Sequence, residues 1–156
     1  MKLGTEPIML KLPSHPRTIS VIESLVNRFA ENYQLDPDLH CNIMVSLTEA
    51  VNNAMIHGNC SDESKNVCIQ FKRVKNTLRI SVSDEGPGFD PHAIPDPTAP
   101  ENITKCGGRG VFLMQQLSHS VKYHDNGSTV EMQFKIAWPH PAMETPSSQW
   151  NPKEME

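Results

Sequence analysis

The chain has 156 residues, of which 37% are hydrophobic and 21% charged, and its formal net charge is −4. This length predicts one domain with a real core and leaves too little chain for two. The acidic balance argues against direct binding of nucleic acid, and no apolar run is long enough to predict a membrane span.

The cysteines and the N-terminal sequence favour a cytoplasmic protein. Cys41, Cys60, Cys68 and Cys106 show no C-x-x-C pairing and no histidine at zinc-binding spacing, so we interpret them as reduced thiols. The N-terminal sequence MKLGTEPIMLKLPSHP has an apolar run broken by proline and does not predict a signal peptide. We therefore expect a cytoplasmic localisation.

The first half of the chain predicts one strand followed by two helices. Pro7–Leu12 is short and apolar, as in a strand, and Thr18–Gln34 places its apolar residues at helical spacing. Asp36-Pro37-Asp38 is a start signal for a longer helix from Pro37 to Ile56. Gly58-Asn59 marks the end of that helix.

The second half predicts four strands, one long loop and a short helix. The loop from Asp84 to Gly110 is too long and too rich in proline for a plain connection, and loops of this kind are usually functional. The other predicted elements are a hairpin of Val67–Val74 and Leu78–Val82, a helix at Gly110–Leu117, and strands at Ser120–Tyr123 and Thr129–Ala137 around an Asp125-Asn126-Gly127 turn.

This order of elements predicts an α+β fold in two layers, a mostly antiparallel sheet with helices on one face. The sequence from Pro139 onward is rich in Pro, Ser, Glu and Lys, which predicts a flexible tail. We therefore expect a single domain over residues 1–138 and a C-terminal tail over 139–156.

The longer predicted helix carries a polar stripe. Its members, Asn42, Ser46, Glu49, Asn53 and His57, step by three or four residues and therefore fall on one side of the helix. One interpretation is a face turned to water, as in most amphipathic helices. The other is the wall of a site, because Asn53 and His57 form helices less readily than the lysine and glutamate usual on a solvent face.

Glu49 and Asn53 are a chemically useful pair, although the E-x-x-x-N pattern alone is a weak signal. A glutamate can take a proton from a hydroxyl or a water as a general base. An amide oxygen can bind a hard cation such as Mg²⁺, which prefers oxygen ligands. Asn52 lies about 100° away from Asn53 around the helix, so Asn53 is the candidate.

Two glycine-rich segments also suggest a ligand site. In SDEGPGFD, Asp84 follows a predicted strand and can accept a hydrogen bond from an exocyclic amine, while Gly86 and Gly88 let the backbone approach a flat ligand. GGRGVFLM, residues 107–114, leads into a helix N-terminus whose N–H groups suit phosphate. The alternatives are a turn that needs glycine and a flexible hinge. Neither segment is a Walker A or a Rossmann motif.

Taken in order, TEAVNNAMIHGN, SDEGPGFDP and GGRGVFLM resemble the N, G1 and G2 boxes of the GHKL ATPase superfamily. Their wording is most similar to the bacterial anti-sigma-factor serine kinases of partner-switching systems. The resemblance covers roughly Ile19 to Ile136. It implies the Bergerat fold, an α/β sandwich that holds ATP with Mg²⁺ between its helices and a mobile lid, here about residues 90–106.

The resemblance also implies roles for single residues. Glu49 corresponds to the catalytic base and Asn53 to the Mg²⁺ ligand at the nucleotide. Asp84 would accept from the adenine amine, with Gly86 and Gly88 shaping that wall. The remaining implied nucleotide contacts are Gly108, Arg109, Gly110 and Val111 near the phosphates and Ser128 or Thr129 near the adenine.

Two of these positions keep alternatives. For Arg109 a solvated side chain and a contact with phosphate or partner are equally good interpretations. His57 is more simply interpreted as packed or hydrogen-bonded at the helix end than as catalytic.

The implied function is an ATP-dependent serine/threonine protein kinase and anti-sigma factor. Its substrate would be a Ser or Thr of a STAS-like anti-sigma-factor antagonist, and a sigma factor or another target would be its second partner. Only some forty residues precede the N box, too few for the helix pair of a histidine kinase, and nothing the size of a transducer domain follows Ala137. The alternative is an ATP-binding anti-sigma or scaffold module without turnover, and a homodimer is left open.

Overall fold

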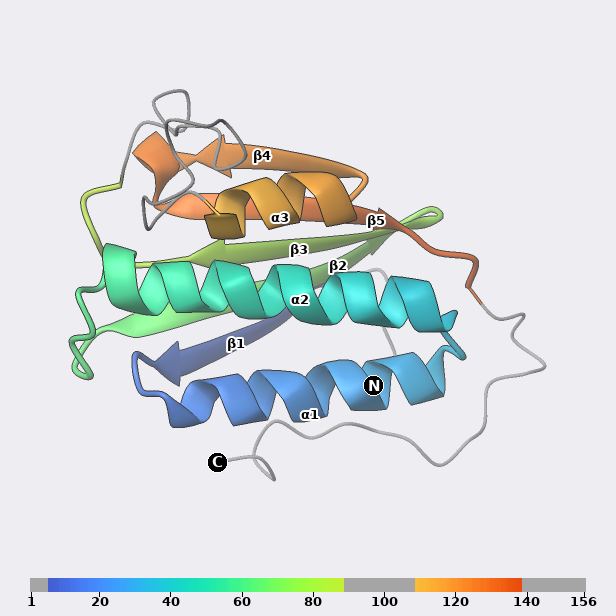
Figure 1. The fold of residues 1–156 in the computed structure, drawn as a ribbon, viewed down its shortest axis with the longest axis horizontal. Coiled ribbons are helices and arrows are strands. Elements are labelled where there is room, and N and C mark those ends of the chain that lie inside the picture. The colour runs from blue at the N-terminus through green and yellow to red at the C-terminus, as the bar shows by residue number, and fades with distance from the viewer. Residues whose placement is uncertain (1–5, 89–108, 139–156) are drawn as a thin grey trace.

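Five antiparallel strands form one sheet in the described part of the chain, and helices cover one of its faces (Figure 1). The structure is a computed structural model that describes residues 6–88 and 109–138. The strand order is β1-β2-β3-β5-β4, and every neighbouring pair is antiparallel. This arrangement confirms the predicted α+β sandwich.

The elements agree with the predicted ones to within a few residues. No described helix is long and apolar enough to cross a membrane. In chain order the elements are β1 (Ile8–Pro13), α1 (Arg17–Asn32), α2 (Pro37–Asn53), β2 (Asn66–Val74), β3 (Thr77–Ser83), α3 (Arg109–Leu117), β4 (Ser120–His124) and β5 (Thr129–Lys135).

The end of α2 differs from the prediction. The α-helix begins as expected, with Pro37 in its first turn and the Asp36 carboxylate accepting from the Asp38 N–H. It ends at Asn53 rather than Ile56, and a π-helix follows from Ala54 to Gly58. The Asn59 N–H donates to the Ala54 carbonyl over 2.8 Å, so the chain closes a wider turn than an α-helix does. Sequence periodicity does not predict such a turn.

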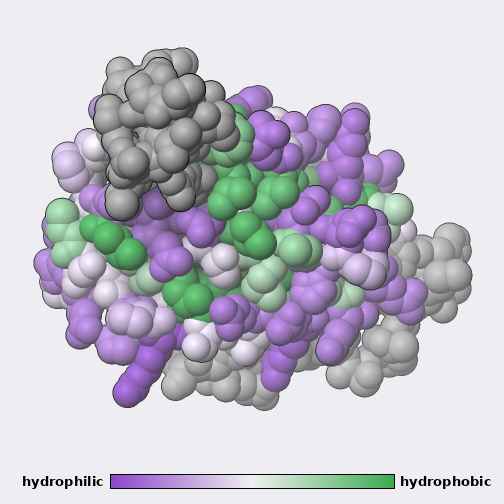
Figure 2. All heavy atoms as spheres, in the orientation of Figure 1, coloured by the Kyte–Doolittle hydropathy of each residue, from purple (hydrophilic) through white to green (hydrophobic). Residues whose placement is uncertain are grey.

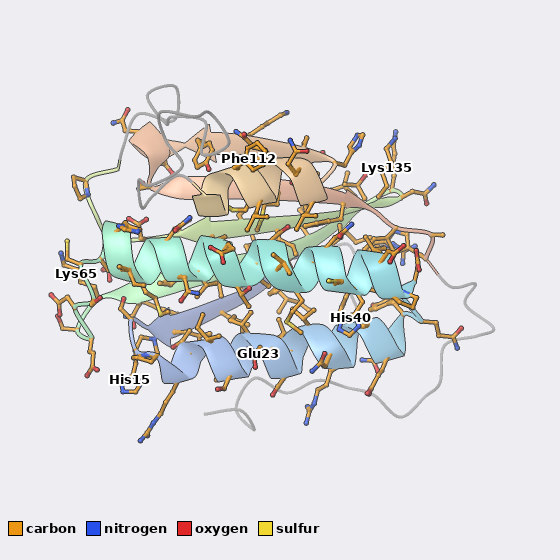
Figure 3. The ribbon with its side chains drawn as sticks, in the orientation of Figure 1. His15, Glu23, His40, Lys65, Phe112 and Lys135 are labelled. Carbon is orange, nitrogen blue, oxygen red and sulfur yellow. The ribbon has the colours of Figure 1, made fainter. Side chains whose placement is uncertain are left out.

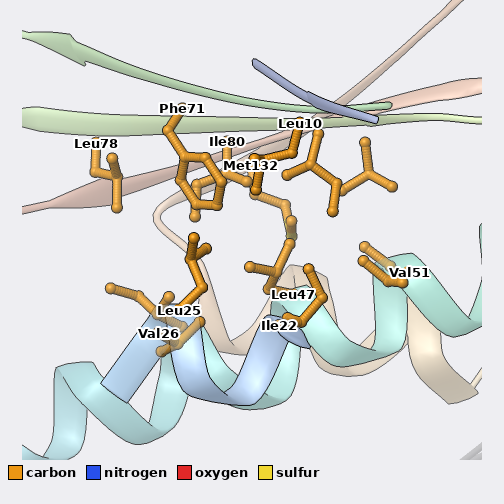
Figure 4. Close-up of a cluster of buried hydrophobic side chains, with 14 of the residues drawn as sticks. Leu10, Ile22, Leu25, Val26, Leu47, Val51, Phe71, Leu78, Ile80 and Met132 are labelled. Atoms are coloured by element: carbon orange, nitrogen blue, oxygen red, sulfur yellow. The ribbon is translucent and has the colours of Figure 1, made fainter. Parts of the chain in front are cut away.

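The core lies between the helices and the sheet (Figure 4). Each fully buried aliphatic side chain contributes about 1.5–3 kcal/mol to stability through the water it no longer contacts. The residues drawn from the helices are Ile22, Leu25 and Val26 on α1 and Leu47 and Val51 on α2, all at most 1% exposed. They face Leu10, Phe71, Leu78, Ile80 and Met132 of the sheet.

The chain after β5 packs against the β2–β3 turn and the C-terminal end of α1. The Trp138 indole N–H donates to the Lys75 carbonyl over 2.6 Å, and the Arg73 guanidinium lies 4.6 Å from the Trp138 ring centroid. The same ring packs edge-on against Tyr33 at the end of α1. Ordered packing therefore continues to Trp138, at the predicted start of the tail, which itself lies outside the described residues.

Ser46 shows that the polar stripe of α2 is not a solvent face along its whole length. The residue is 0% exposed, and its hydroxyl oxygen has no hydrogen-bond partner among the residues that the structure describes. Helix α3 lies beside α2 on the sheet and packs against it (Figure 1). Within the described residues the Ser46 hydroxyl is thus buried without compensation, which is energetically unfavourable.

We expect Ser46→Ala to raise the free energy of unfolding by about 1 kcal/mol, because it removes an unpaired buried hydroxyl and improves helix propensity. Urea denaturation with an unchanged m-value measures the effect. Ser20→Ala, on the exposed face of α1, is the matched control and reports the propensity gain alone. A clear loss of stability in Ser46→Ala would contradict the assignment of an unpaired hydroxyl.

Candidate functional site

The end of the π-helix that follows α2 packs directly on the segment after β3, and this contact brings two of the predicted motifs together. A Cβ placed on Gly58 would lie 2.3 Å from the Asp84 carboxyl carbon, and one placed on Gly86 would lie 2.0 Å from the Gly58 carbonyl oxygen. Both distances are too short for any real side chain. The two glycines therefore bring the end of the polar stripe against the predicted adenine-binding carboxylate.

Asp84 is held through its backbone and one carboxylate oxygen. Its N–H donates to the Ser128 carbonyl over 2.9 Å, and its Oδ1 accepts from the Gly86 N–H over 2.8 Å. Within residues 6–88 and 109–138, no hydrogen bond reaches Oδ2. Burial raises the pKa of the Asp84 carboxyl above its ordinary value, and the Gly86 N–H offsets part of that rise. A partly buried carboxylate with one unengaged oxygen suits an amine donor.

Gly88 makes a second close backbone contact at this end of the sheet. Its φ is +82°, and a Cβ there would lie 2.0 Å from the Asn126 carbonyl oxygen. Asn126 itself has left-handed backbone angles, φ 56° and ψ 33°, in the turn between β4 and β5. Glycine is the residue that tolerates both the conformation and the contact. The segment after β3 is thus fitted between the α2 end and the β4–β5 turn.

Glu49 and Asn53 lie one turn apart near the C-terminal end of α2, and both are partly buried. The π-helix that directly follows Asn53 ends at Gly58, which packs on Asp84. His57 falls in the π-helix and is exposed.

Ser128 and Thr129, the two residues predicted to lie near the adenine, differ from each other in how they are placed relative to the site. Thr129 pairs with Ser83, and its hydroxyl contacts the Ser83 hydroxyl at 2.9 Å and the Asp125 carboxylate at 3.0 Å. Its strand neighbour Val130 points into the core below the helices, so the Thr129 side chain points to the opposite face of the sheet. Ser128 reaches the site through its carbonyl, which accepts from the Asp84 N–H.

The predicted phosphate-binding segment is only partly described. Arg109, Gly110 and Val111 form the first turn of α3, whereas Gly108 and the predicted lid, about residues 90–106, lie outside the described residues. Apolar side chains gather over α3 on the helix-covered surface (Figure 2), where Leu113 is 37% exposed. The structure places the start of this helix beside α2 and leaves the phosphate contacts as predictions.

The donor set fits a nucleotide with its own phosphate oxygens better than a metal held by protein alone. In the part of the chain that the structure describes, no three His, Cys, Asp or Glu side chains gather to hold a metal ion. Mg²⁺ commonly binds one or two protein oxygens together with substrate phosphates and waters. Asn53, as a single predicted protein ligand, matches that pattern.

Two residues at the site carried no predicted role beyond ending the helix, namely Gly58 and Asn59. Their place next to the stripe was the only available signal, because contact with Asp84 depends on how the sheet and helices pack. Figure 3 shows this end of the molecule, where Lys65 lies in the loop after the π-helix and His15 precedes α1, opposite His40 and Lys135.

We expect Gly58→Ala to lower ATP affinity and to destabilise the fold by about 1–3 kcal/mol, because the added methyl group would overlap the Asp84 carboxylate. Gly58 does not have a positive φ, so the close contact alone opposes alanine. Equilibrium ATP titration and urea denaturation measure the two effects. Ile56→Ala, 51% exposed in the same π-helix, is the control and should change neither strongly.

Comparison with known proteins agrees with this geometry. A family model described as the histidine kinase-like ATPase domain matches residues 12–134. Curated proteins named serine-protein kinase RsbW are similar over most of their length. The Bacillus licheniformis protein is 29% identical over 139 residues, covering 85% of this chain and 87% of the relative. The Bacillus subtilis (strain 168) protein is 27% identical, with the same coverage of 85% and 87%.

A solved structure shares the fold. The RsbU and RsbW domains of a Mycobacterium tuberculosis protein match with a TM-score of 0.58 and 14% sequence identity. The match covers 88% of this chain and 34% of that longer chain, so it concerns one part of the solved protein. Since the family model spans most of the sequence and the described fold agrees with it, this chain belongs to the histidine kinase-like ATPase domain family.

Proposed function

We propose that this chain is an ATP-dependent serine/threonine protein kinase and an anti-sigma factor of a partner-switching system. The observation that carries the proposal is the packing of Gly58 on Asp84, which is so close that a Cβ on Gly58 would lie 2.3 Å from the Asp84 carboxyl carbon. This contact joins the stripe of Glu49 and Asn53 to the carboxylate suited to an adenine amine. The names of the RsbW relatives support the kinase class.

The nucleotide would lie with its adenine at Asp84 and its phosphates toward Asn53 and the start of α3. Asp84 Oδ2 would accept from the adenine amine, while the Gly86 N–H keeps Oδ1 in place. The helix N-terminus at Arg109 and Gly110 provides N–H groups for phosphate oxygens. Asn53 would hold Mg²⁺, which neutralises charge on the phosphates.

The reaction is transfer of the γ-phosphoryl group from ATP to a Ser or Thr hydroxyl. The hydroxyl oxygen bonds to the γ-phosphorus, the bond to the β,γ-bridging oxygen breaks, and ADP leaves. Glu49 would orient the hydroxyl and take its proton. Such transfer depends mainly on positioning and charge neutralisation, which this set of residues supplies.

The proposed partners are proteins. The acceptor is a STAS-like anti-sigma-factor antagonist, whose phosphorylation would release the kinase to bind a sigma factor or another target. A cytoplasmic location belongs to the same proposal, whereas a homodimer is left open.

The test is incubation of the full chain with ATP labelled at the γ-phosphate, Mg²⁺ and each antagonist-domain protein of its own genome. Label on one Ser or Thr of an antagonist supports the kinase. Normal ATP binding without label on any antagonist would support the non-catalytic scaffold instead. Absence of ATP binding, with Asp84→Asn making no difference, would contradict both.

A further inference from the structure

Asn59 is a buried polar residue that no step of the proposed reaction uses. It is 0% exposed, although it directly follows the π-helix at the end of α2. Its side chain makes three hydrogen bonds to three separate segments of the chain. The amide nitrogen donates to the Ser14 hydroxyl at 2.9 Å and to the Asn66 carbonyl at 3.0 Å, and the amide oxygen accepts from the Glu85 N–H at 2.7 Å.

These partners fix the orientation of the amide. The Asn66 carbonyl can only accept and the Glu85 N–H can only donate, so the nitrogen and oxygen of Asn59 cannot exchange places. Ser14 is anchored in turn, because both its N–H and its hydroxyl donate to the Lys65 carbonyl, at 3.1 Å and 2.8 Å. Asn59 therefore joins the β1–α1 turn, the start of β2 and the segment after β3.

Glu85 is held a second time from the same side. Its carboxylate accepts from the Asn66 N–H, while its own N–H donates to Asn59. Glu85 lies between Asp84 and Gly86, the two residues that form the hydrogen bond at the candidate adenine site. The segment after β3 is thus fixed on one side by Asn59 and Asn66, and on the other by the Ser128 carbonyl that accepts from Asp84.

We propose that Asn59 is a positioning residue for recognition of the base, and that the hydrogen bond donated by the Asn66 N–H to the Glu85 carboxylate assists it. Asn59 does not contact the nucleotide and acts by holding the peptide that aims Asp84. The inference rests on the proposed function, because it takes adenine as the ligand of Asp84. It adds the residue that sets the discrimination between an amine and an oxygen at position 6 of the purine.

The experiment compares equilibrium dissociation constants of ATP and inosine triphosphate in the presence of Mg²⁺, for the full-length chain and for Asn59→Ala. Inosine triphosphate carries an oxygen where ATP carries the 6-amine and has the same triphosphate. The ratio of the two constants therefore isolates base recognition from phosphate binding and from overall stability. We expect the native ratio to favour ATP by at least about tenfold and Asn59→Ala to bring it close to one.

Ile80→Val is the matched control for stability, since Ile80 is 0% exposed in the middle of β3 and takes no part in the Asn59 network. It should lower the melting temperature and leave the ratio unchanged. If Asn59→Ala fails to fold, Glu85→Ala replaces it, because Glu85 is exposed and its carboxylate supplies the second bond.

The outcomes separate the two proposals. A native preference for ATP that persists in Asn59→Ala, or in Glu85→Ala where that variant is used, would overturn the positioning role and leave the proposed kinase intact. A native chain that binds both nucleotides equally would overturn base recognition by Asp84, and the positioning role with it. A ratio lost in the variant and kept in Ile80→Val supports the inference.

Discussion

Replacing Glu49 by glutamine is expected to slow phosphoryl transfer to the antagonist by about 10²–10⁴-fold while ATP still binds. The amide keeps the size of the side chain and its partly buried place on α2, but it cannot accept the hydroxyl proton. Single-turnover transfer from γ-labelled ATP gives the rate, and an equilibrium titration gives the affinity. A loss of rate with unchanged affinity is the result expected for a base that acts on the acceptor rather than on the nucleotide.

Glu23→Gln is the matched control for this substitution. Glu23 is exposed on α1, away from the end of α2 that meets Asp84 (Figure 3). The same change of charge there should leave the transfer rate unaltered. Equal rates in the native chain and in Glu49→Gln would remove Glu49 from the chemistry and favour a group elsewhere in the chain.

Asp84→Asn is expected to lower ATP affinity by about tenfold to a hundredfold. The Gly86 N–H donates to Oδ1, so the asparagine oxygen must take that position and its NH₂ group must take the position of Oδ2. A donor then faces the adenine amine, which is also a donor. The same NH₂ group suits the 6-oxygen of inosine triphosphate, and we expect affinity for that nucleotide to rise.

A preference of Asp84→Asn for inosine triphosphate over ATP is a more informative result than loss of ATP binding, because a misfolded variant loses affinity for both nucleotides. Thermal unfolding in the absence of nucleotide provides the control for folding. Unchanged preference for ATP in Asp84→Asn would show that the base is read elsewhere.

The Asp84→Asn substitution should not lower the free energy of unfolding at neutral pH. Burial raises the pKa of the Asp84 carboxyl in the folded chain, so the folded state holds this proton more tightly than the unfolded state does. The contribution of Asp84 to the free energy of unfolding therefore falls as the pH rises through the raised pKa. Between the ordinary pKa of an aspartate and the raised pKa of Asp84, the free energy of unfolding of Asp84→Asn should increase relative to that of the native chain. Above the raised pKa this difference should level off. A difference that stays constant with pH would contradict the raised pKa.

Local patterns predicted most of the fold correctly. The apolar spacing of α1 and α2 and the alternation of β2 and β3 are properties of neighbouring residues, and each element formed within a few residues of its predicted range. The end of α2 was the exception. The turn at Ala54–Gly58 is a π-helix, and Gly58 and Asn59 at its end contact Asp84 and Glu85, which follow β3 and are distant in sequence.

The candidate site divides in the same way. The resemblance of three motifs to the GHKL boxes predicts Glu49, Asn53, Asp84, Gly86 and Gly88 as a nucleotide-binding set, and this set stays a prediction. The face of the sheet on which the Thr129 side chain lies could not be predicted from the sequence, because it depends on the pairing of Thr129 with Ser83. Whether a polar residue of the stripe is solvated depended on tertiary packing, which leaves the Ser46 hydroxyl buried without a partner in the described chain.

By itself the sequence determined the fold class, the family motifs and the candidate chemical groups, because residue type and periodicity act over one or two turns of chain. Only the tertiary structure decided which of these groups meet. Gly58 lies on Asp84, and Asn59 fixes the peptide of Glu85, because the sheet register and the packing of α2 bring these distant segments within hydrogen-bonding range. Contacts of that kind depend on the whole fold, and no local pattern encodes them.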